Sequence, residues 1–182
     1  MNIRRTEKDD IPKLVPMLIK SFSDDPFYQW TFPDSSLIPV YFEDYLGKAI
    51  QEGRTYTTNG CHGVAIWGSE SKFTANTPSP QSPPASPRSL EYLRAMQFLH
   101  DSRPDEAHFY LLVIATDPQM RRQGIGRLLV NTPPRFHDRK QPTYLEATTK
   151  QSVAFYKKIG FSMISTLQIP QGPPVWGMLR KE

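Results

Sequence analysis

The chain has 182 residues, of which 38% are apolar and 12% aromatic, and a formal net charge of +4. These values are ordinary for a globular protein, and the length predicts one domain with its own core. The charged start MNIRRTEKDD lacks the apolar stretch of a signal peptide, and no apolar run is long enough to cross a bilayer, so we expect a cytoplasmic protein without a membrane partner. The single cysteine, Cys61, excludes an internal disulfide and a cysteine-rich zinc site, and we expect no bound metal.

The N-terminal part of the chain predicts a strand followed by a helix. Residues 2–6 are typical of a short strand, and Thr6 with Asp9 is typical of a capping box that opens a helix. Apolar residues follow at helical spacing through residues 11–22. The next segment, DDPFYQWTFPD at residues 24–34, is rich in aromatic residues and is predicted to be irregular.

A second helix and a hairpin are predicted next. Residues 35–52 have helical apolar spacing, with Gly53 just past the end. Residues 54–67 contain two β-prone runs around Asn59-Gly60, a dipeptide that favours a tight turn. A Pro/Ser-rich stretch at residues 74–89 is then predicted to be a flexible loop within the domain.

The middle of the chain predicts a helix, a strand and a second helix. Residues 90–99 favour a helix, and the apolar run at residues 108–116 favours a strand buried on both faces. A helix is expected from Gly124, and Pro133-Pro134 should end it within about two or three turns.

The C-terminal part adds one more strand and helix and two closing strands. Residues 143–148 favour a strand, residues 152–159 a helix capped by Gly160, and residues 161–169 and 175–181 the closing strands. Helices and strands mix without strict alternation, so the fold class is α/β with a mixed sheet.

Positive charge is concentrated between residues 119 and 160, which hold nine lysines or arginines against Asp138 and Glu146. Nucleic acid, a small polyanionic ligand and plain solvent are all compatible with such a segment. Basic and aromatic residues do not interleave regularly there, and no nucleic-acid reader motif occurs, so we expect no nucleic-acid partner.

The stretch TDPQMRRQGIG, residues 116–126, joins the buried strand to a helix. Amides at a helix start lack intrahelical partners and, with the helix dipole, favour an anion. Gly124 and Gly126 would let a phosphate approach the backbone, and Arg121, Arg122 and Arg127 add charge around it.

Two other phosphate motifs fit this turn less well. No G-x-x-x-x-G-K-[ST] pattern is present, and Leu129 stands where a dinucleotide fingerprint needs a small residue. The simplest alternative is an exposed glycine turn among arginines.

The wider context of RRQGIG resembles a known family. About thirty residues later comes YLEATTKQSVAFYKKIGF, and together these segments look like the acyl-CoA-binding core of the GNAT superfamily of N-acetyltransferases. The segments DDPFYQWTFPD, GVAIW and HFYL, in this order, are similar to its puromycin N-acetyltransferase-like branch. The resemblance implies a single GNAT domain over residues 1–182, with a mixed, mostly antiparallel sheet, flanking helices and a splayed strand pair.

The resemblance also implies acetyl-CoA as cosubstrate. Ile114, Ala115 and Thr116 would face the pantetheine arm and the acetyl carbonyl. The pyrophosphate would be held by amides of Arg121, Arg122, Gln123, Gly124, Ile125, Gly126 and Arg127. Ser152 would bind the cofactor or a neighbouring loop from the position where this branch often has Asn.

Catalytic roles follow from the same resemblance. Tyr156 matches the general acid that protonates the CoA thiolate, and simple aromatic packing on a helix is the alternative interpretation of this residue. Glu146 is the first candidate for the base that deprotonates the amine, and it could instead pair with an arginine. His108 is the second candidate, and a structural hydrogen bond would also explain it.

The acceptor is expected to be a small-molecule primary amine. Asp24 and Asp25 could bind its cation, or could only end a helix, and Phe27, Tyr28 and Trp30 suggest an apolar or aromatic acceptor. The resulting hypothesis is direct acetyl transfer through a ternary complex by a monomer or homodimer. A non-catalytic acyl-CoA-binding sensor or partner-binding module is the alternative.

Overall fold

The computed structural model describes residues 1–68, 89–132 and 141–181. Contacts divide the chain into two compact units. The first unit contains residues 1–24, 38–69 and 111–139, and the second contains residues 25–37, 70–110 and 140–182. Each unit is described separately below.

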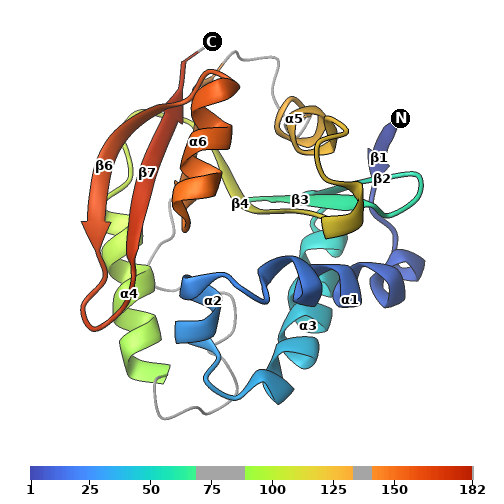
Figure 1. The fold of residues 1–182 in the computed structure, drawn as a ribbon, viewed down its shortest axis with the longest axis horizontal. Helices are drawn as coiled ribbons and strands as arrows, with labels where there is room; N and C mark the ends of the chain where they lie inside the picture. The colour runs from blue at the N-terminus through green and yellow to red at the C-terminus, as the bar shows by residue number, and fades with distance from the viewer. Residues whose placement is uncertain (69–88, 133–140, 182) are drawn as a thin grey trace. The chain divides into compact units, whose positions relative to one another are not determined.

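The first unit is an antiparallel sheet with helices on both sides. Figure 1 shows α5 on one side of β3, and α1 with α3 on the other. Its elements are β1 (Ile3–Arg5), α1 (Ile11–Phe22), α3 (Ile38–Gln51), β2 (Thr55–Thr58), β3 (Gly63–Trp67), the part of β4 (Phe109–Thr116) that starts at Leu111, and α5 (Ile125–Val130).

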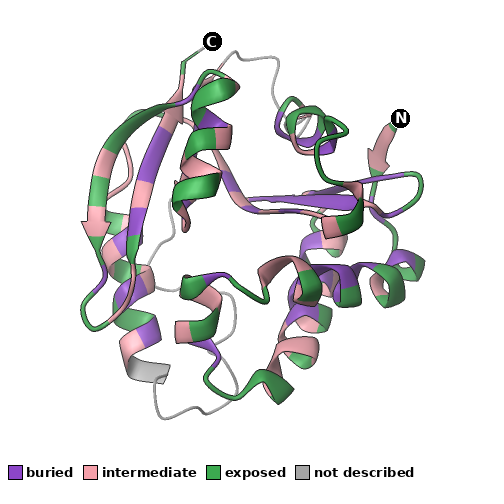
Figure 2. Cartoon of the chain, in the orientation of Figure 1, coloured by how far each residue is buried: buried purple, intermediate pink, exposed green. Residues whose placement is uncertain are grey.

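The core of the first unit follows from the helical spacing of apolar residues. Leu14 and Leu18 of α1 are fully buried, as are Phe42 and Leu46 of α3, and α1 continues through Pro16. All five residues of β3 are buried between the two helical layers, as the purple strand in Figure 2 shows.

The second unit combines a three-stranded ladder with three helices. In it β7 lies between β5 and β6 and is antiparallel to both. Its elements are α2 (Pro26–Thr31), α4 (Ser89–Asp101), the start of β4 at Phe109 and Tyr110, β5 (Thr143–Ala147), α6 (Lys150–Lys158), β6 (Ser162–Gln168) and β7 (Pro174–Arg180). A core cluster of Ala95 and Leu99 from α4 with Ile169 and Val175 joins α4 to the β6–β7 hairpin.

The strands are hydrogen bonded in the order β1-β2-β3-β4-β5-β7-β6. Every pair is antiparallel except β4 with β5, which are parallel and paired only at Phe109 with Thr143 and at Tyr110 with Tyr144. The predicted fold class, α/β with a mixed and mostly antiparallel sheet and flanking helices, is confirmed. No helix among the described residues has the length and apolar content needed to span a bilayer.

Several local predictions differ from the structure. The aromatic segment predicted as irregular contains α2, which Asp25 caps and Pro26 begins, a combination that pre-organises a first turn. The capping box at the start of the chain uses Glu7 and Asp10, one residue later than predicted.

Two strand predictions need similar correction. Burial in β4 alternates along the strand, so one face is buried and the other is half-buried. The turn between β2 and β3 spans four residues, and the left-handed conformation falls on Cys61, with φ of 56°, rather than on the Asn59-Gly60 pair. Ser89, the last residue of the predicted Pro/Ser loop, begins α4, and the remainder of that loop lies outside the described residues.

Candidate active site

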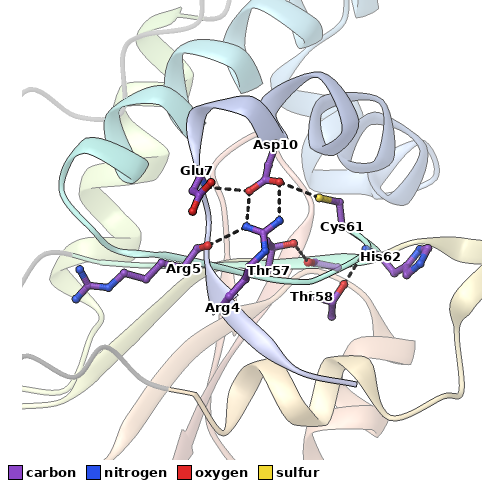
Figure 3. A network of polar contacts seen from close by, with 9 residues as sticks. Arg4, Arg5, Glu7, Asp10, Thr57, Thr58, Cys61 and His62 are labelled. Carbon is purple, nitrogen blue, oxygen red and sulfur yellow. Dashed lines mark hydrogen bonds and ion pairs between the residues drawn. The ribbon is translucent and has the colours of Figure 1, made fainter.

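The β2–β3 turn of the first unit is held by a polar network (Figure 3). Arg4 donates two hydrogen bonds of 2.7 Å to the carboxylate of Asp10, which also accepts from the Glu7 amide at 2.8 Å. The buried thiol of Cys61 donates to Asp10 at 3.3 Å. This network fixes the residues just before β3, including His62.

The fixed turn positions the segment that follows β4. The amide of Asp117 donates to the His62 carbonyl at 2.9 Å, and the Asp117 carboxylate caps the short 3-10 helix η3 (Pro118–Met120) through the Gln119 amide at 2.9 Å. Ser21 of α1 donates to the Thr116 carbonyl at 3.0 Å. The end of β4 is therefore tied to two neighbouring elements.

The predicted phosphate turn lies between η3 and α5. Arg122 has φ of 65° and Gly124 has φ of 81°, so both residues adopt the left-handed conformation before α5 begins. Among the described residues, the amides of residues 121 to 127 have no hydrogen-bond acceptor. A run of open amides is what an anion-binding turn requires.

Three arginine side chains surround these amides. Arg121, Arg122 and Arg127 are exposed, and none forms an ion pair within the described part of the chain. Their charge is therefore available to a polyanion at this turn.

Gly63, which the sequence analysis did not single out, lets α5 pack closely against the sheet. A Cβ at Gly63 would lie 2.7 Å from Cγ2 of Ile125 and 3.0 Å from the carbonyl oxygen of Ala115 and from Cδ1 of Leu129. Only glycine allows this approach, so the position of α5 and of the turn before it depends on Gly63. A glycine at the start of the strand GVAIW was the sequence feature that could have indicated this close packing.

The remaining predicted cofactor residues of the first unit lie on β4. Ile114, Ala115 and Thr116 pair with Ala65, Val64 and Gly63 of β3. Ala115 is buried, while Ile114 and Thr116 share the half-buried face.

Tyr156, the predicted general acid, lies in α6 of the second unit. Its ring is buried and packs against Phe161 with ring centroids 5.5 Å apart. Burial raises the pKa of the phenol, and its hydroxyl has no hydrogen-bond partner among the described residues. Tyr156 is thus a protonated donor that no described group engages.

Ser152 takes part in the cap of α6. Its hydroxyl donates to the Thr149 carbonyl at 2.8 Å, and its amide donates to the Thr149 hydroxyl at 3.0 Å. The predicted cofactor contact would compete with this cap.

The two candidate bases differ in environment. The Glu146 side chain on β5 is 8% exposed and lies 3.5 Å from the Nε atom of Arg103. Burial raises the Glu146 pKa, and Arg103 opposes that rise. The Nδ1 atom of His108 lies 2.7 Å from the Glu106 carbonyl, which can only accept, so Nδ1 carries the proton and Nε2 alone could accept one.

The predicted acceptor residues lie around α2. Asp25 is buried, and its carboxylate accepts hydrogen bonds from the amides of Phe27 and Tyr28 and from the Thr148 hydroxyl. Trp30 donates from Nε1 to the Gln171 carbonyl at 2.8 Å, in the β6–β7 turn. Phe27, Tyr28 and Trp30 are half-buried, and the ring of Phe27 contacts those of Tyr28 and Trp30 at 6.0 Å.

The predicted residues therefore fall into two groups. Those expected to bind the cofactor, except Ser152, belong to the first unit, as does the acceptor candidate Asp24. Ser152 belongs with the catalytic residues and the other acceptor residues to the second unit. No group of three potential metal ligands occurs among the residues that the structure describes.

The sequence and the structure were compared with those of known proteins. Residues 92–163, which run from α4 to the start of β6, match the model of the acetyltransferase (GNAT) domain. The chain has the GNAT fold. The match to the domain model supports an acyltransferase enzyme.

Three solved structures illustrate the likeness. The structure described as histone acetyltransferase HPA2 and related acetyltransferase from Corynebacterium glutamicum is 23% identical, with a TM-score of 0.68 over 99% of this chain and 95% of that one. Arylalkylamine N-acetyltransferase 2 from Aedes aegypti is 13% identical, with a TM-score of 0.70 over 99% and 98%. Agmatine N-acetyltransferase is 15% identical, with a TM-score of 0.68 over 98% and 97%. At these identities the likeness concerns the fold.

Proposed function

We propose that this chain is a cytoplasmic N-acetyltransferase that transfers acetyl from acetyl-CoA to a primary amine of a small molecule. The observation that carries the proposal is the turn at residues 121–127, with its open amides and three exposed arginines. It lies inside the segment that matches the acetyltransferase domain model. The order of DDPFYQWTFPD, GVAIW and HFYL supports placement in the puromycin N-acetyltransferase-like branch.

In this proposal the turn binds the CoA pyrophosphate through the amides of residues 121–127. Ile114, Ala115 and Thr116 face the pantetheine arm and the acetyl carbonyl. Ser152 contacts the cofactor from the start of α6. Charge-assisted hydrogen bonds from arginine add to the affinity.

The proposed chemistry is direct attack within a ternary complex. The amine nitrogen attacks the thioester carbonyl, the C–S bond breaks, and Tyr156 gives its proton to the CoA thiolate. The raised pKa of Tyr156 keeps the phenol protonated until the sulfur becomes basic. Glu146, or His108 through Nε2, accepts the proton that the amine must lose.

Cys61 supports direct transfer over a covalent intermediate. It is the sole cysteine of the chain, it is buried, and its thiol donates to Asp10. Burial raises its pKa, whereas a nucleophilic cysteine requires a lowered one.

The acceptor is proposed to contact Asp25, Phe27, Tyr28 and Trp30. Three adjacent aromatic side chains favour an apolar or aromatic amine. Because both Asp25 oxygens already accept hydrogen bonds, its proposed role is to shape α2 and to present a negative charge, with direct contact to the ammonium group through a remaining lone pair.

The first test is thermal unfolding with and without acetyl-CoA, with equimolar ATP as the control for polyanion binding. At a hundred times the dissociation constant, a ligand adds about 2.7 kcal/mol of stability. For a chain of this size the melting temperature should rise by about 5 to 10 °C. Equal shifts with ATP and acetyl-CoA would argue against a specific cofactor site.

The second test measures release of the CoA thiol with three acceptors: 2-phenylethylamine, agmatine and a lysine-containing peptide. Faster release with 2-phenylethylamine is expected. Binding of acetyl-CoA without thiol release from a wide amine panel would identify a non-catalytic acyl-CoA-binding module instead.

A further inference from the structure

Arg103, on the segment between α4 and β4, lies at the centre of a buried polar group in the second unit. We name Arg103, Tyr110, Tyr144 and Glu146 the Arg103 cluster. The Arg103 and Glu146 side chains are 16% and 8% exposed, and Tyr144 is fully buried. Arg103 lies two residues past the end of α4, and its amide donates to the His100 carbonyl at 3.2 Å.

Tyr110 holds the guanidinium of Arg103 beside Glu146. The guanidinium carbon lies 3.7 Å from the centre of the Tyr110 ring, within the range of a strong cation–π contact. Tyr110 pairs with Tyr144 across β4 and β5, and their rings stack at 6.1 Å and 29°. Arg103 is therefore oriented by a ring fixed in the sheet.

Among the described residues, the other elements around Glu146 offer hydroxyl groups to it. Gly177 of β7 lies directly opposite Glu146 and pairs on its other side with Ser165 of β6. The neighbouring hydroxyls of Tyr110 and Tyr144 lower the Glu146 pKa, and within the described residues the buried hydroxyl of Ser165 has no hydrogen-bond partner. His108 contacts the Tyr144 ring at 5.5 Å. Arg103 is the charged group among the described residues that opposes the burial of Glu146.

The Arg103–Glu146 pair differs in geometry from the Arg4–Asp10 pair. Arg4 binds Asp10 through two 2.7 Å hydrogen bonds and lowers the carboxyl pKa. The Nε atom of Arg103 lies 3.5 Å from Oε1 of Glu146, and burial keeps the Glu146 pKa raised. The short hydrogen bonds from Arg4 keep the Asp10 carboxylate ionised. The longer contact of Arg103 places a positive charge beside Glu146 and only opposes the effect of burial.

We propose that Arg103 is a positioning residue that holds Glu146 as an ionised proton acceptor for the attacking amine. The inference rests on the proposed acetyl transfer and adds to it a residue outside the predicted site. A general base must be deprotonated at the working pH, and a buried carboxylate with no cation nearby would be neutral. Tyr110 takes part by orienting the guanidinium.

The direct test is a carboxyl ¹³C NMR titration of glutamate-labelled protein, with the Glu146 signal identified by its loss in Glu146→Gln. In Arg103→Met the titration midpoint of Glu146 should rise by about one to three pH units. Arg103→Lys keeps the charge but loses the planar stacking on Tyr110, so it should give a smaller rise. The control Arg94→Met removes an exposed arginine of α4 and should leave the midpoint unchanged.

The catalytic half of the inference is tested by the pH dependence of kcat with acetyl-CoA and 2-phenylethylamine. The acidic limb should move upward in Arg103→Met and Arg103→Lys by the amounts seen in the NMR titration, and binding of acetyl-CoA should be unchanged. Melting temperatures of the variants identify any loss of folding, and Arg103→Lys decides the question if Arg103→Met does not fold.

An unchanged Glu146 midpoint in both variants would overturn the inference. A raised midpoint with an unmoved acidic limb would also overturn it, because Glu146 would then not be the proton acceptor. Absence of transfer by the unsubstituted protein would overturn the proposed function and the catalytic half of the inference together, and the titration would still decide whether Arg103 controls the ionisation of Glu146.

Discussion

Asp10 and Asp25 are both buried carboxylates, and their partners give them opposite properties. The Arg4 guanidinium lowers the pKa of Asp10, and burial raises the pKa of Asp25, whose partners are amides and a hydroxyl without full charge. Single residues in this chain thus acquire their ionisation from the groups that the fold brings beside them.

Replacing Asp10 by Asn should lower the free energy of unfolding by about 1 to 3 kcal/mol at neutral pH, since charged hydrogen bonds to Arg4 are lost. Because the folded pKa lies below the unfolded value near ~3.9, this contribution is present above about pH 4 and declines as pH falls below it. Urea unfolding of both proteins from pH 3 to 7 measures the difference. Asp9→Asn, at an exposed neighbour, is the control and should show no such pattern.

Replacing Tyr156 by Phe should lower kcat by about 10² to 10⁴-fold, because the proton donor to the thiolate is lost. Affinity for acetyl-CoA and the melting temperature should change little, since the hydroxyl has no described partner. Tyr56→Phe removes another buried hydroxyl without a described partner and should leave kcat unchanged. Equal kcat values for Tyr156→Phe and the unsubstituted protein would remove Tyr156 from the mechanism.

At the scale of elements, the close approach of α5 to β3 determines where the phosphate turn lies. The approach rests on Gly63, beneath Ile125 and Leu129. The turn itself was predictable, because glycine spacing and a preceding apolar run are local features of the sequence. The packing of α5 against Gly63 was not predicted, since this contact joins residues more than sixty positions apart.

Gly63→Ala should weaken acetyl-CoA binding and lower stability by about 1 to 3 kcal/mol, because the methyl group would overpack against Ile125 and the Ala115 carbonyl. Calorimetric titration and thermal unfolding measure the two effects. The control is Gly47→Ala in α3, where a Cβ meets nothing within 4 Å and stability should increase by about 0.5 to 1 kcal/mol. Unchanged acetyl-CoA binding in Gly63→Ala would show that the phosphate turn does not depend on the packing of α5 against Gly63.

Other elements show why sequence patterns have limits. The strands and longer helices were predictable from apolar periodicity, but α2 was missed because its aromatic residues do not form a helical stripe. Arg103 was missed for a different reason: it lies 43 residues from Glu146, and only the pairing of β4 with β5 brings its neighbours together. The sequence analysis allowed Glu146 to pair with an arginine. Which arginine lies beside it could be known only from the fold.

At the scale of the whole chain, charge is distributed unevenly, with nine lysines or arginines between residues 119 and 160. Three of them, Arg121, Arg122 and Arg127, are exposed at the phosphate turn. Exposed charges act over about 10 Å at 0.1 M salt and about 3 Å at 1 M, so affinity for a polyanion should depend on ionic strength.

Arg121→Gln should weaken acetyl-CoA binding at 0.1 M salt by about 0.3 to 1 kcal/mol, and most of this loss should disappear at 1 M. Titration calorimetry at both salt concentrations gives the values. Arg94→Gln, which removes an exposed arginine from α4, should have no effect at either concentration. A loss that persisted at 1 M salt would point to a direct, desolvated contact.

The central position of β7 has a consequence for how the chain is made. β7 comes after β5 and β6 in the chain, yet it is the strand that joins them. While the chain is being synthesised, β5 and β6 have no strand between them until residues 174–180 have left the ribosome. The second unit can therefore close only after β7 has been synthesised, and until then the exposed edges of β5 and β6 are the part of the nascent chain that a chaperone would have most reason to cover.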